Sequence, residues 1–322
     1  MNRRKFIKRG SNAAIAFAVA DPLLRTLFAY PVEEFAGEIP KRVLGKTGEK
    51  VTIMGLGGWT LGRIKDDKVA LDMISKAFDV GINFFDTAHS YQDGRSETLY
   101  GKGLKGRRDK VFLMSKSTKR TREEAQKELD LTLKRLQTDH LDLWQFHSIK
   151  KKKDVDTIFA PGGAFEVAAK AKTEGKIRFI GITGHFDPHT HLQALKHHEL
   201  LDTIQMPINL VDPHQLSFTK MVLPKALEHN LGIIAMKTIA NGRILEHQVA
   251  PIRECLTYVW NLPVSVIVSG CDLPEHIVQN SETAKTFRKL TEKERKRILA
   301  STAKFNGPEV EYYKKKTAGR SW

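Results

Sequence analysis

Cysteine, long apolar runs and one familiar glycine motif are scarce or missing in this sequence. Only two of its 322 residues are cysteines, Cys255 and Cys271, and they form no C-x-x-C pair, so the fold cannot depend on a disulfide framework. After the first 30 residues no apolar run is long enough to cross a bilayer, and we therefore expect no stable membrane span in the mature protein. A G-x-G-x-x-G fingerprint is also missing, because residues 54–59 are glycine-rich but wrongly spaced for it.

Acidic residues are too few to balance the basic ones. Lysine and arginine number 53 against 37 aspartates and glutamates, which gives a formal net charge of +16. Basic clusters occur at residues 150–153 and 314–316, but no stacking pattern of aromatic and basic residues accompanies them. We interpret these clusters as solvated surface and expect no nucleic-acid partner. The hydrophobic share of 41% is enough to bury a sizeable core.

The N-terminus has the layout of an export signal. A charged start precedes a short apolar run of small residues, and residues 18–20 form an A-x-A cleavage site. The pair Arg3 and Arg4 is followed by Phe6, an aliphatic residue and Lys8, which resembles the twin-arginine (Tat) export signal. This resemblance implies a bacterial protein exported in folded form, with the twin-arginine translocation machinery as a partner. The expected location is therefore the periplasm or another exported site.

A regular alternation of apolar runs and helical patterns follows. The apolar, β-branched runs start 26 to 36 residues apart, near Val51, Ile82, Val111, Leu141, Ile177, Thr203, Gly232 and Val264. Amphipathic helical patterns lie between these runs. Eight strand–helix units over about 250 residues predict an α/β fold of the closed (β/α)8 or TIM barrel type. An open doubly wound sheet is the alternative, and the missing glycine fingerprint argues against it.

Three further features complete the predicted architecture. Apolar segments on either side of Gly45 and Gly48 indicate a β-hairpin before the barrel. Thr121 and Glu124 have the T-x-x-E spacing of a capping box and predict the start of a helix. The pattern of residues 291–303 predicts an extra helix after the barrel.

These patterns divide the chain into four parts. We predict a signal peptide at residues 1–30, cleaved near Ala20 or slightly later, and a linker at residues 31–40. The barrel, with its hairpin and extra helix, is predicted to span residues 41–303. Residues 304–322 are predicted to be a polar basic tail.

Charged and polar side chains stand at the predicted ends of three neighbouring strands. The second strand ends at Asp86, the third at Lys116 and the fourth at His147, while Tyr91 lies on the loop after the second strand. Chemistry in such barrels sits at the carboxyl ends of the strands, so the four residues are expected to share one rim. Each of them singly has an ordinary structural interpretation, but their coincidence on one rim favours a functional site.

The four residues have the chemistry of a proton-transfer site. A phenol with an ordinary pKa of about 10 is a weak acid at neutral pH, and a nearby lysine ammonium favours its phenolate. Asp86 would keep Lys116 charged and in place, and His147 could orient a substrate oxygen through a hydrogen bond. The set suits protonation of an alkoxide formed when hydride reaches a carbonyl carbon, and the hydride requires a nicotinamide cofactor.

The motifs around this rim resemble those of the aldo-keto reductases. The matching segments are F-F-D-T-A-H-S-Y, M-S-K and the strand ending Q-F-H, and the resemblance extends roughly from Lys41 to Thr283. It implies a (β/α)8 enzyme, an oxidoreductase that interconverts a carbonyl and an alcohol with NAD(P)H. By resemblance Tyr91 is the catalytic acid, and Asp86, Lys116 and His147 complete the catalytic set. A small-molecule carbonyl or sugar-like substrate is expected.

The resemblance is less complete on the cofactor side. Thr183 stands where the family has Ser, whereas Gly184 replaces the Asn that holds the nicotinamide amide, a role left to His185 or water. Gly270 and His276 stand where the family has a Lys and an Arg that favours the 2′-phosphate of NADP. We therefore expect NADP or NAD as the cofactor. The implied cofactor-binding residues are Gly58, Trp59, Asp86, Thr183, His185, Gln205, Lys237 and Asn280.

Two other functions are compatible with a barrel of this composition. One is a metal-dependent hydrolase, suggested by five histidines, but most of these fall on one predicted helix, residues 188–200, rather than on several strand ends, so no metal ligand is assigned. They are His185, His189, His191, His197 and His198. The other is a non-catalytic, redox-responsive partner protein that keeps the cofactor pocket, since members of the family serve as channel subunits. The complete set of four catalytic residues favours an enzyme.

Overall fold

The computed structural model describes residues 37–315, so the predicted signal peptide, most of the linker and the end of the tail lie outside the described residues. The described part opens with the predicted hairpin, in which β1 (Lys41–Val43) pairs antiparallel with β2 (Lys50–Thr52). Leu44 and Val51 are fully buried among the residues that fill the barrel. The turn needs glycine at position 45, where φ is +51° and a Cβ would lie 2.3 Å from the backbone nitrogen of Gly232.

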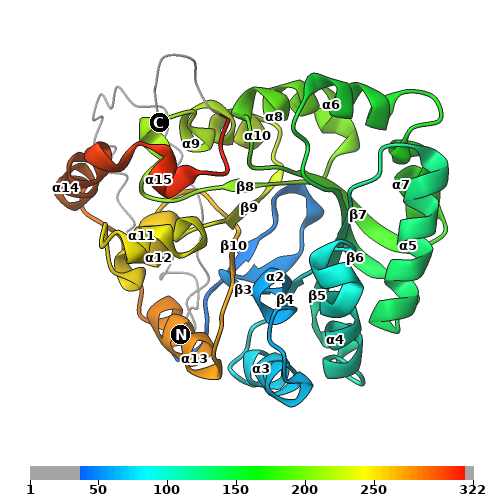
Figure 1. Ribbon diagram of the computed structural model, residues 1–322, viewed down its shortest axis with the longest axis horizontal. Coiled ribbons are helices and arrows are strands. Elements are labelled where there is room, and N and C mark those ends of the chain that lie inside the picture. The colour runs from blue at the N-terminus through cyan, green and yellow to red at the C-terminus, as the bar shows by residue number, and fades with distance from the viewer. Residues whose placement is uncertain (1–36, 316–322) are drawn as a thin grey trace, which may run out of the picture.

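Eight parallel strands close into the predicted barrel (Figure 1). The first barrel strand begins at Met54 rather than near Val51, because the apolar run there is shared between the hairpin and the barrel and the chain bends at Ile53. Each following strand begins within two residues of its predicted start. The barrel strands are β3 (Met54–Gly57), β4 (Phe84–Asp86), β5 (Phe112–Ser117), β6 (Leu141–Phe146), β7 (Ile177–Thr183), β8 (Thr203–Pro207), β9 (Gly232–Met236) and β10 (Val266–Ser269).

Successive side chains along a barrel strand point alternately into the barrel and toward the surrounding helices, so the protein has two hydrophobic cores. Phe112 and Met114 of β5 point into the barrel with the hairpin residues, whereas Leu113 packs in the larger core between the strands and the helices. Before residue 290, the outer helices with eight or more residues are α3 (Asp67–Asp79), α4 (Arg95–Gly103), α5 (Arg122–Leu136), α6 (Lys152–Phe159), α7 (Ala164–Thr173), α12 (Ile252–Trp260) and α13 (Pro274–Lys285). The shorter ones are α2 (Gly58–Leu61), α8 (Pro188–Ala194), α9 (Phe218–Met221), α10 (Leu223–Glu228) and α11 (Arg243–Glu246).

The N-termini of α5 and of the extra helix differ in their capping. Thr121 is the N-cap of α5, as predicted, but its hydroxyl donates to the Glu124 carboxylate at 2.7 Å instead of capping a backbone N–H, so the predicted capping box is wrong. The extra helix is confirmed as α14 (Glu292–Thr302), which has a complete capping box. There Thr291 Oγ1 accepts from the Glu294 N–H, and the Glu294 carboxylate accepts from the Thr291 N–H.

The described part of the predicted tail packs on the barrel through α15 (Pro308–Glu311) and the residues after it. Lys314 is buried, so its interpretation as solvated surface is wrong. Its ammonium lies 2.7 Å from Asp212 Oδ1 and 2.6 Å from Glu311 Oε2. The two carboxylates offset the cost of burying this ammonium. The basic cluster in the sequence does not reveal these partners. Within residues 37–315 no helix is long and apolar enough to span a membrane.

Candidate active site

The four residues predicted for one rim do lie together. Asp86 ends β4, Lys116 lies on β5, His147 directly follows β6, and Tyr91 lies on the loop after β4. Lys116 Nζ is 2.7 Å from Asp86 Oδ1 and 3.3 Å from the Tyr91 hydroxyl. The His147 ring meets the Tyr91 ring edge to face, with centroids 5.6 Å apart. The parallel strands bring these side chains together because their carboxyl ends meet on one face.

Burial dominates the protonation of this cluster. It raises the pKa of Tyr91 well above 10, and the Asp86 carboxylate adds to the rise. In the free protein, burial therefore outweighs the expected effect of the neighbouring Lys116 on the pKa of Tyr91. Burial also lowers the pKa of Lys116, against the pull of Asp86, and holds the pKa of His147 well below 6.5. Tyr91 is thus a protonated phenol, and His147 is a neutral imidazole.

The short helix α2, which directly follows β3, brings Gly58 and Trp59 to the same rim. A Cβ at Gly58 would lie 2.4 Å from Ser96 Oγ and 2.7 Å from the backbone oxygen of Asp86, so only glycine lets α2 approach β4 this closely. The Trp59 ring is 51% exposed and packs edge to face against Tyr91, with centroids 5.3 Å apart. Trp59 therefore forms one wall of the entrance to the site.

Gln205 and Thr183 are placed across the barrel from Tyr91. The two residues pair in register on β8 and β7, and both side chains are buried. Gln205 Nε2 donates to Asp86 Oδ2 at 3.0 Å, which links β8 to the catalytic carboxylate. The Gln205 Oε1 atom is buried and has no hydrogen-bond partner within the described chain. It remains an acceptor for an amide group of a ligand.

Gly184 has no room for a larger side chain. A Cβ there would lie 2.6 Å from the backbone oxygen of Ile149 and 2.9 Å from the ring of His191. Burial lowers the pKa of His191 to about 4, and the neutral ring approaches the Gln205 backbone oxygen at 3.4 Å. The imidazole of His191 thus fills the space that an asparagine side chain at position 184 would need.

His185 and Lys237 both contact a residue that the sequence did not suggest, Tyr313. The Tyr313 ring meets His185 edge to face at 5.8 Å, and Lys237 Nζ lies 5.0 Å from the ring centre. Burial and Lys237 lower the pKa of His185 to about 4, and burial lowers the pKa of Lys237 to about 8. The two tyrosines at 312 and 313, within an otherwise polar tail, were the only available signal of this contact.

Asn280 stands apart from the catalytic residues, on α13. Its Nδ2 donates to Ser269 Oγ at 3.4 Å, while its buried Oδ1 has no partner in the described chain. Cys271 lies beside it, and burial raises the pKa of that thiol to about 11. The pKa of Cys255 is raised to about 12, so both cysteines are buried, protonated thiols.

These residues fit a nicotinamide dinucleotide. Gln205 and Asn280 each present a buried, unpartnered carbonyl oxygen, and such atoms match the amide and amine groups at the two ends of that cofactor. Lys237 lies near the barrel rim with Asn241 Oδ1 as a neutral partner at 3.2 Å, so its ammonium can take up a phosphate. The three residues come from three separate elements, with Gln205 on β8, Lys237 directly after β9 and Asn280 on α13, which suits an extended molecule.

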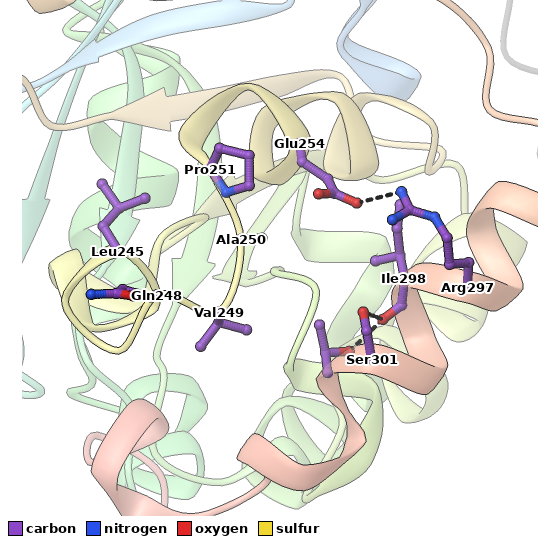
Figure 2. Close-up of a pocket in the computed structure, with 10 residues that line it drawn as sticks. Leu245, Gln248, Val249, Ala250, Pro251, Glu254, Arg297, Ile298 and Ser301 are labelled. Atoms are coloured by element: carbon purple, nitrogen blue, oxygen red, sulfur yellow. Dashed lines mark hydrogen bonds and ion pairs between the residues drawn. The ribbon is translucent and has the colours of Figure 1, made fainter.

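A groove between α11, α12 and α14 lies outside this site (Figure 2). It has a volume of about 500 Å³, and apolar residues such as Leu245, Val249 and Ile298 share its lining with polar ones. The Glu254–Arg297 ion pair crosses it. None of the four catalytic candidates lines it, so the groove adds nothing to their chemistry.

The histidine-rich segment is dispersed by the fold. His191 packs on Phe218, whereas the His197 ring stacks on Phe159 and the His198 ring stacks on His229. Among residues 37–315 no three of His, Cys, Asp and Glu are grouped to hold a metal ion. The described residues therefore offer no support for a metal-dependent hydrolase.

Known proteins resemble this chain along most of its length. The model of the aldo/keto reductase family matches residues 53–303. YqkF, an uncharacterized oxidoreductase of Bacillus subtilis (strain 168), is 26% identical over 309 residues, covering 81% of this chain and 96% of YqkF. L-galactose dehydrogenase of Arabidopsis thaliana is 37% identical over 161 residues, 46% of this chain and 49% of that enzyme. The holo form of an aldo-keto reductase from Bacillus halodurans aligns with a TM-score of 0.69 and 26% identity, covering 81% of this chain and 95% of that structure.

Proposed function

The chain belongs to the aldo/keto reductase family and is an NAD(P)-dependent oxidoreductase, and we propose that it is an exported enzyme that interconverts a carbonyl compound and its alcohol. The observation that carries the reaction is the contact of the Tyr91 hydroxyl with Lys116 Nζ at 3.3 Å, beside Asp86 and His147. A buried, protonated phenol with an ammonium beside it is suited to giving a proton to a substrate oxygen.

Each side chain of the rim has one part in this reaction. The bound cofactor supplies the hydride that reduces the carbonyl carbon. Tyr91 donates its proton to the substrate oxygen as negative charge develops there, and Lys116 stabilises the phenolate that this leaves behind. Asp86 keeps Lys116 charged in its buried position. His147, which is neutral, donates a hydrogen bond to the same substrate oxygen.

The cofactor is held by residues that surround this rim. Gln205, Thr183 and His185 bind the nicotinamide amide, Lys237 binds the phosphates and Asn280 binds the adenine. Gly58 and Trp59 line the approach to Tyr91. Both NADP and NAD meet these requirements, because none of the named contacts depends on the 2′-phosphate.

A sugar-like substrate is the class that the entrance suits best. About half of Trp59 is exposed, so its ring can pack on the C–H face of a sugar ring while it stays in contact with Tyr91. L-galactose dehydrogenase, a relative by sequence, acts on a sugar by its name. Turnover of an aldose panel compared with short aliphatic aldehydes of equal concentration tests this choice, and equal kcat/KM for both classes would contradict it.

Export is proposed on the sequence of residues 1–30 alone. Because free nicotinamide cofactors are expected to be scarce outside the cytoplasm, the enzyme would leave the cell folded around its cofactor. Fusing residues 1–40 to a folded reporter should place the reporter in the periplasm, and replacing Arg3 and Arg4 by lysine should keep it in the cytoplasm. A reporter that stays in the cytoplasm in both cases would exclude this route.

The decisive test of the function is the content of the purified protein. The enzyme should be isolated from its host and denatured, and the released small molecules identified by nicotinamide absorbance and mass. We expect NADP or NAD, in an amount close to one per chain, and reduction of at least one aldehyde by the reduced form. If neither cofactor is bound and neither supports reduction of an aldehyde panel, the proposed oxidoreductase function is wrong.

We expect Lys237→Met to raise the Kd for the cofactor about tenfold to 10²-fold, the worth of a hydrogen bond to a charged group. The pKa of Lys237 is about 8 in the free protein, so its charge is present below that pH and lost above it. Wild-type affinity should therefore weaken as pH rises through this range, whereas the variant should lose this dependence. Fluorescence titration measures both, and the exposed Lys225→Met on α10 is the control, since it should match the wild type.

A further inference from the structure

The turn directly after Tyr91 is held in a conformation that its sequence does not favour. Gln92, Asp93 and Gly94 have φ values of 45°, 53° and 87°, three left-handed residues in succession. Glycine adopts this region freely and aspartate tolerates it, whereas Gln92 is strained there. Such strain persists where the surroundings impose it, and it often lies beside functional residues.

Arg135, from the last turn of α5, is the group that holds this turn. Its guanidinium donates to the backbone oxygen of Asp93 at 3.1 Å and to that of His89 at 3.4 Å, so it grips the chain on both sides of Tyr91. It also lies directly against Gly94, where a Cβ would be 2.0 Å from the Arg135 Cζ atom. The two terminal nitrogens of the guanidinium bond the two oxygens separately, an arrangement that the single nitrogen of a lysine cannot reproduce.

Glu97 links Arg135 to the strand that carries Lys116. The carboxylate of Glu97 is fully buried, and its Oε2 accepts from Arg135 at 3.3 Å. Its Oε1 accepts from Ser115 Oγ at 2.7 Å and from Thr132 Oγ1 at 2.8 Å. Ser115 directly precedes Lys116 on β5. The pair thus joins the loop of the phenol to the strand of the ammonium through one buried carboxylate.

We propose that Arg135 and Glu97 are a positioning pair that sets the Tyr91 hydroxyl against Lys116 Nζ. Neither residue lies among the groups assigned to substrate or cofactor, and both act through the backbone on either side of the catalytic side chains. This inference rests on the proposed function, since it concerns the placement of the proposed acid. It adds two residues, outside the strand ends, on which the rate of proton transfer depends.

The test is a double-mutant cycle between Arg135→Lys and Tyr91→Phe, read as single-turnover reduction rates with saturating cofactor. A displacement of about 1 Å can cost about 10²-fold in rate, so Arg135→Lys should lower kcat about 10²-fold and leave KM within about twofold. In the Tyr91→Phe protein, where no hydroxyl remains to be positioned, the same change should cost less than about twofold. Lys134→Met, an exposed change on the same helix, is the control and should leave kcat unchanged.

A second variant covers the case in which Arg135→Lys does not fold. Glu97→Gln keeps an acceptor for Ser115 and Thr132 and weakens only the hold on Arg135, so it should show the same loss in kcat and the same disappearance of that loss beside Tyr91→Phe. Equal fractional losses in both backgrounds, or full kcat in both single variants, would overturn the positioning role while the proposed reaction stands. Full turnover by Tyr91→Phe itself would overturn the proposed reaction and the inference together.

Discussion

Tyr91→Phe should lower the rate of carbonyl reduction by about 10²- to 10⁴-fold, the usual worth of a general acid. The fold should survive, because the hydroxyl makes one long contact, to Lys116 at 3.3 Å, and the ring keeps its packing against Trp59 and His147. Cofactor affinity should not change. Stopped-flow reduction kinetics and a cofactor titration on the same preparation give the two quantities.

The pH dependence gives an independent check on the same residue. Reduction needs the protonated phenol, and because burial raises the pKa of Tyr91, its rate should stay level between about pH 6 and 9. Protonation of His147 should not lower the reduction rate in this range, since its pKa lies well below 6.5. Alcohol oxidation needs the phenolate, so its rate should rise with pH by about tenfold per unit over the same range. The rise of the oxidation rate with pH should disappear in Tyr91→Phe.

Tyr312→Phe is the matched control for this change. It removes the same hydroxyl from a tyrosine that is 54% exposed and that accepts one hydrogen bond, from Asn241 at 2.8 Å. Its reduction rate should equal that of the wild type. A Tyr91→Phe protein that keeps more than half of wild-type turnover would remove Tyr91 from the acid role.

Lys116→Met should abolish measurable turnover and also destabilise the protein by about 3 to 5 kcal/mol, the usual cost of breaking a buried ion pair. The pair is 1% and 2% exposed, so the Asp86 carboxylate would be left buried without its cation. Gln205 still donates to Asp86, which favours the lower end of this range. Urea unfolding measures the change in free energy, and single-turnover assays measure the rate.

The double variant Lys116→Met with Asp86→Asn separates stability from catalysis. Neutralising the carboxylate removes the uncompensated charge, so much of the lost stability should return, but the phenol still lacks its ammonium and the activity should not. Lys119→Met is the control, because its ion pair with Glu124 is about half exposed and should be worth at most about 1 kcal/mol. A Lys116→Met protein as stable as Lys119→Met would show that the buried pair does not support the fold.

The sequence predicted the catalytic rim because strand periodicity carries the necessary geometry. Once the runs ending at Asp86, Lys116 and His147 are assigned to neighbouring parallel strands, barrel closure places their carboxyl ends on one face. The hairpin followed from its glycine-bearing turn, and the extra helix followed from the local pattern of residues 291–303. Where a pattern was shared by two elements, as around Val51, the boundary could not be placed by pattern alone.

Contacts between residues far apart in the chain could not be predicted from local sequence patterns. Tyr313 reaches His185 across more than a hundred residues, and Lys314 is buried by Asp212, so a tail that is polar in sequence is packed in space. Position 184 needs glycine because the ring of His191 fills the space beside it. No local periodicity records which side chain fills a given volume.

The sequence by itself determined the barrel, the order of its strands and the presence of an acid, a phenol, a lysine and a histidine at one rim. These depend on alternation and on strand ends, which are local properties of the chain. Only the tertiary structure decided how these groups are charged and how Tyr91 is aligned. Burial sets the pKa of the phenol against the pull of Lys116, and Arg135 with Glu97 joins the loop to the strand, because desolvation and long-range hydrogen bonds exist only once the chain has closed on itself.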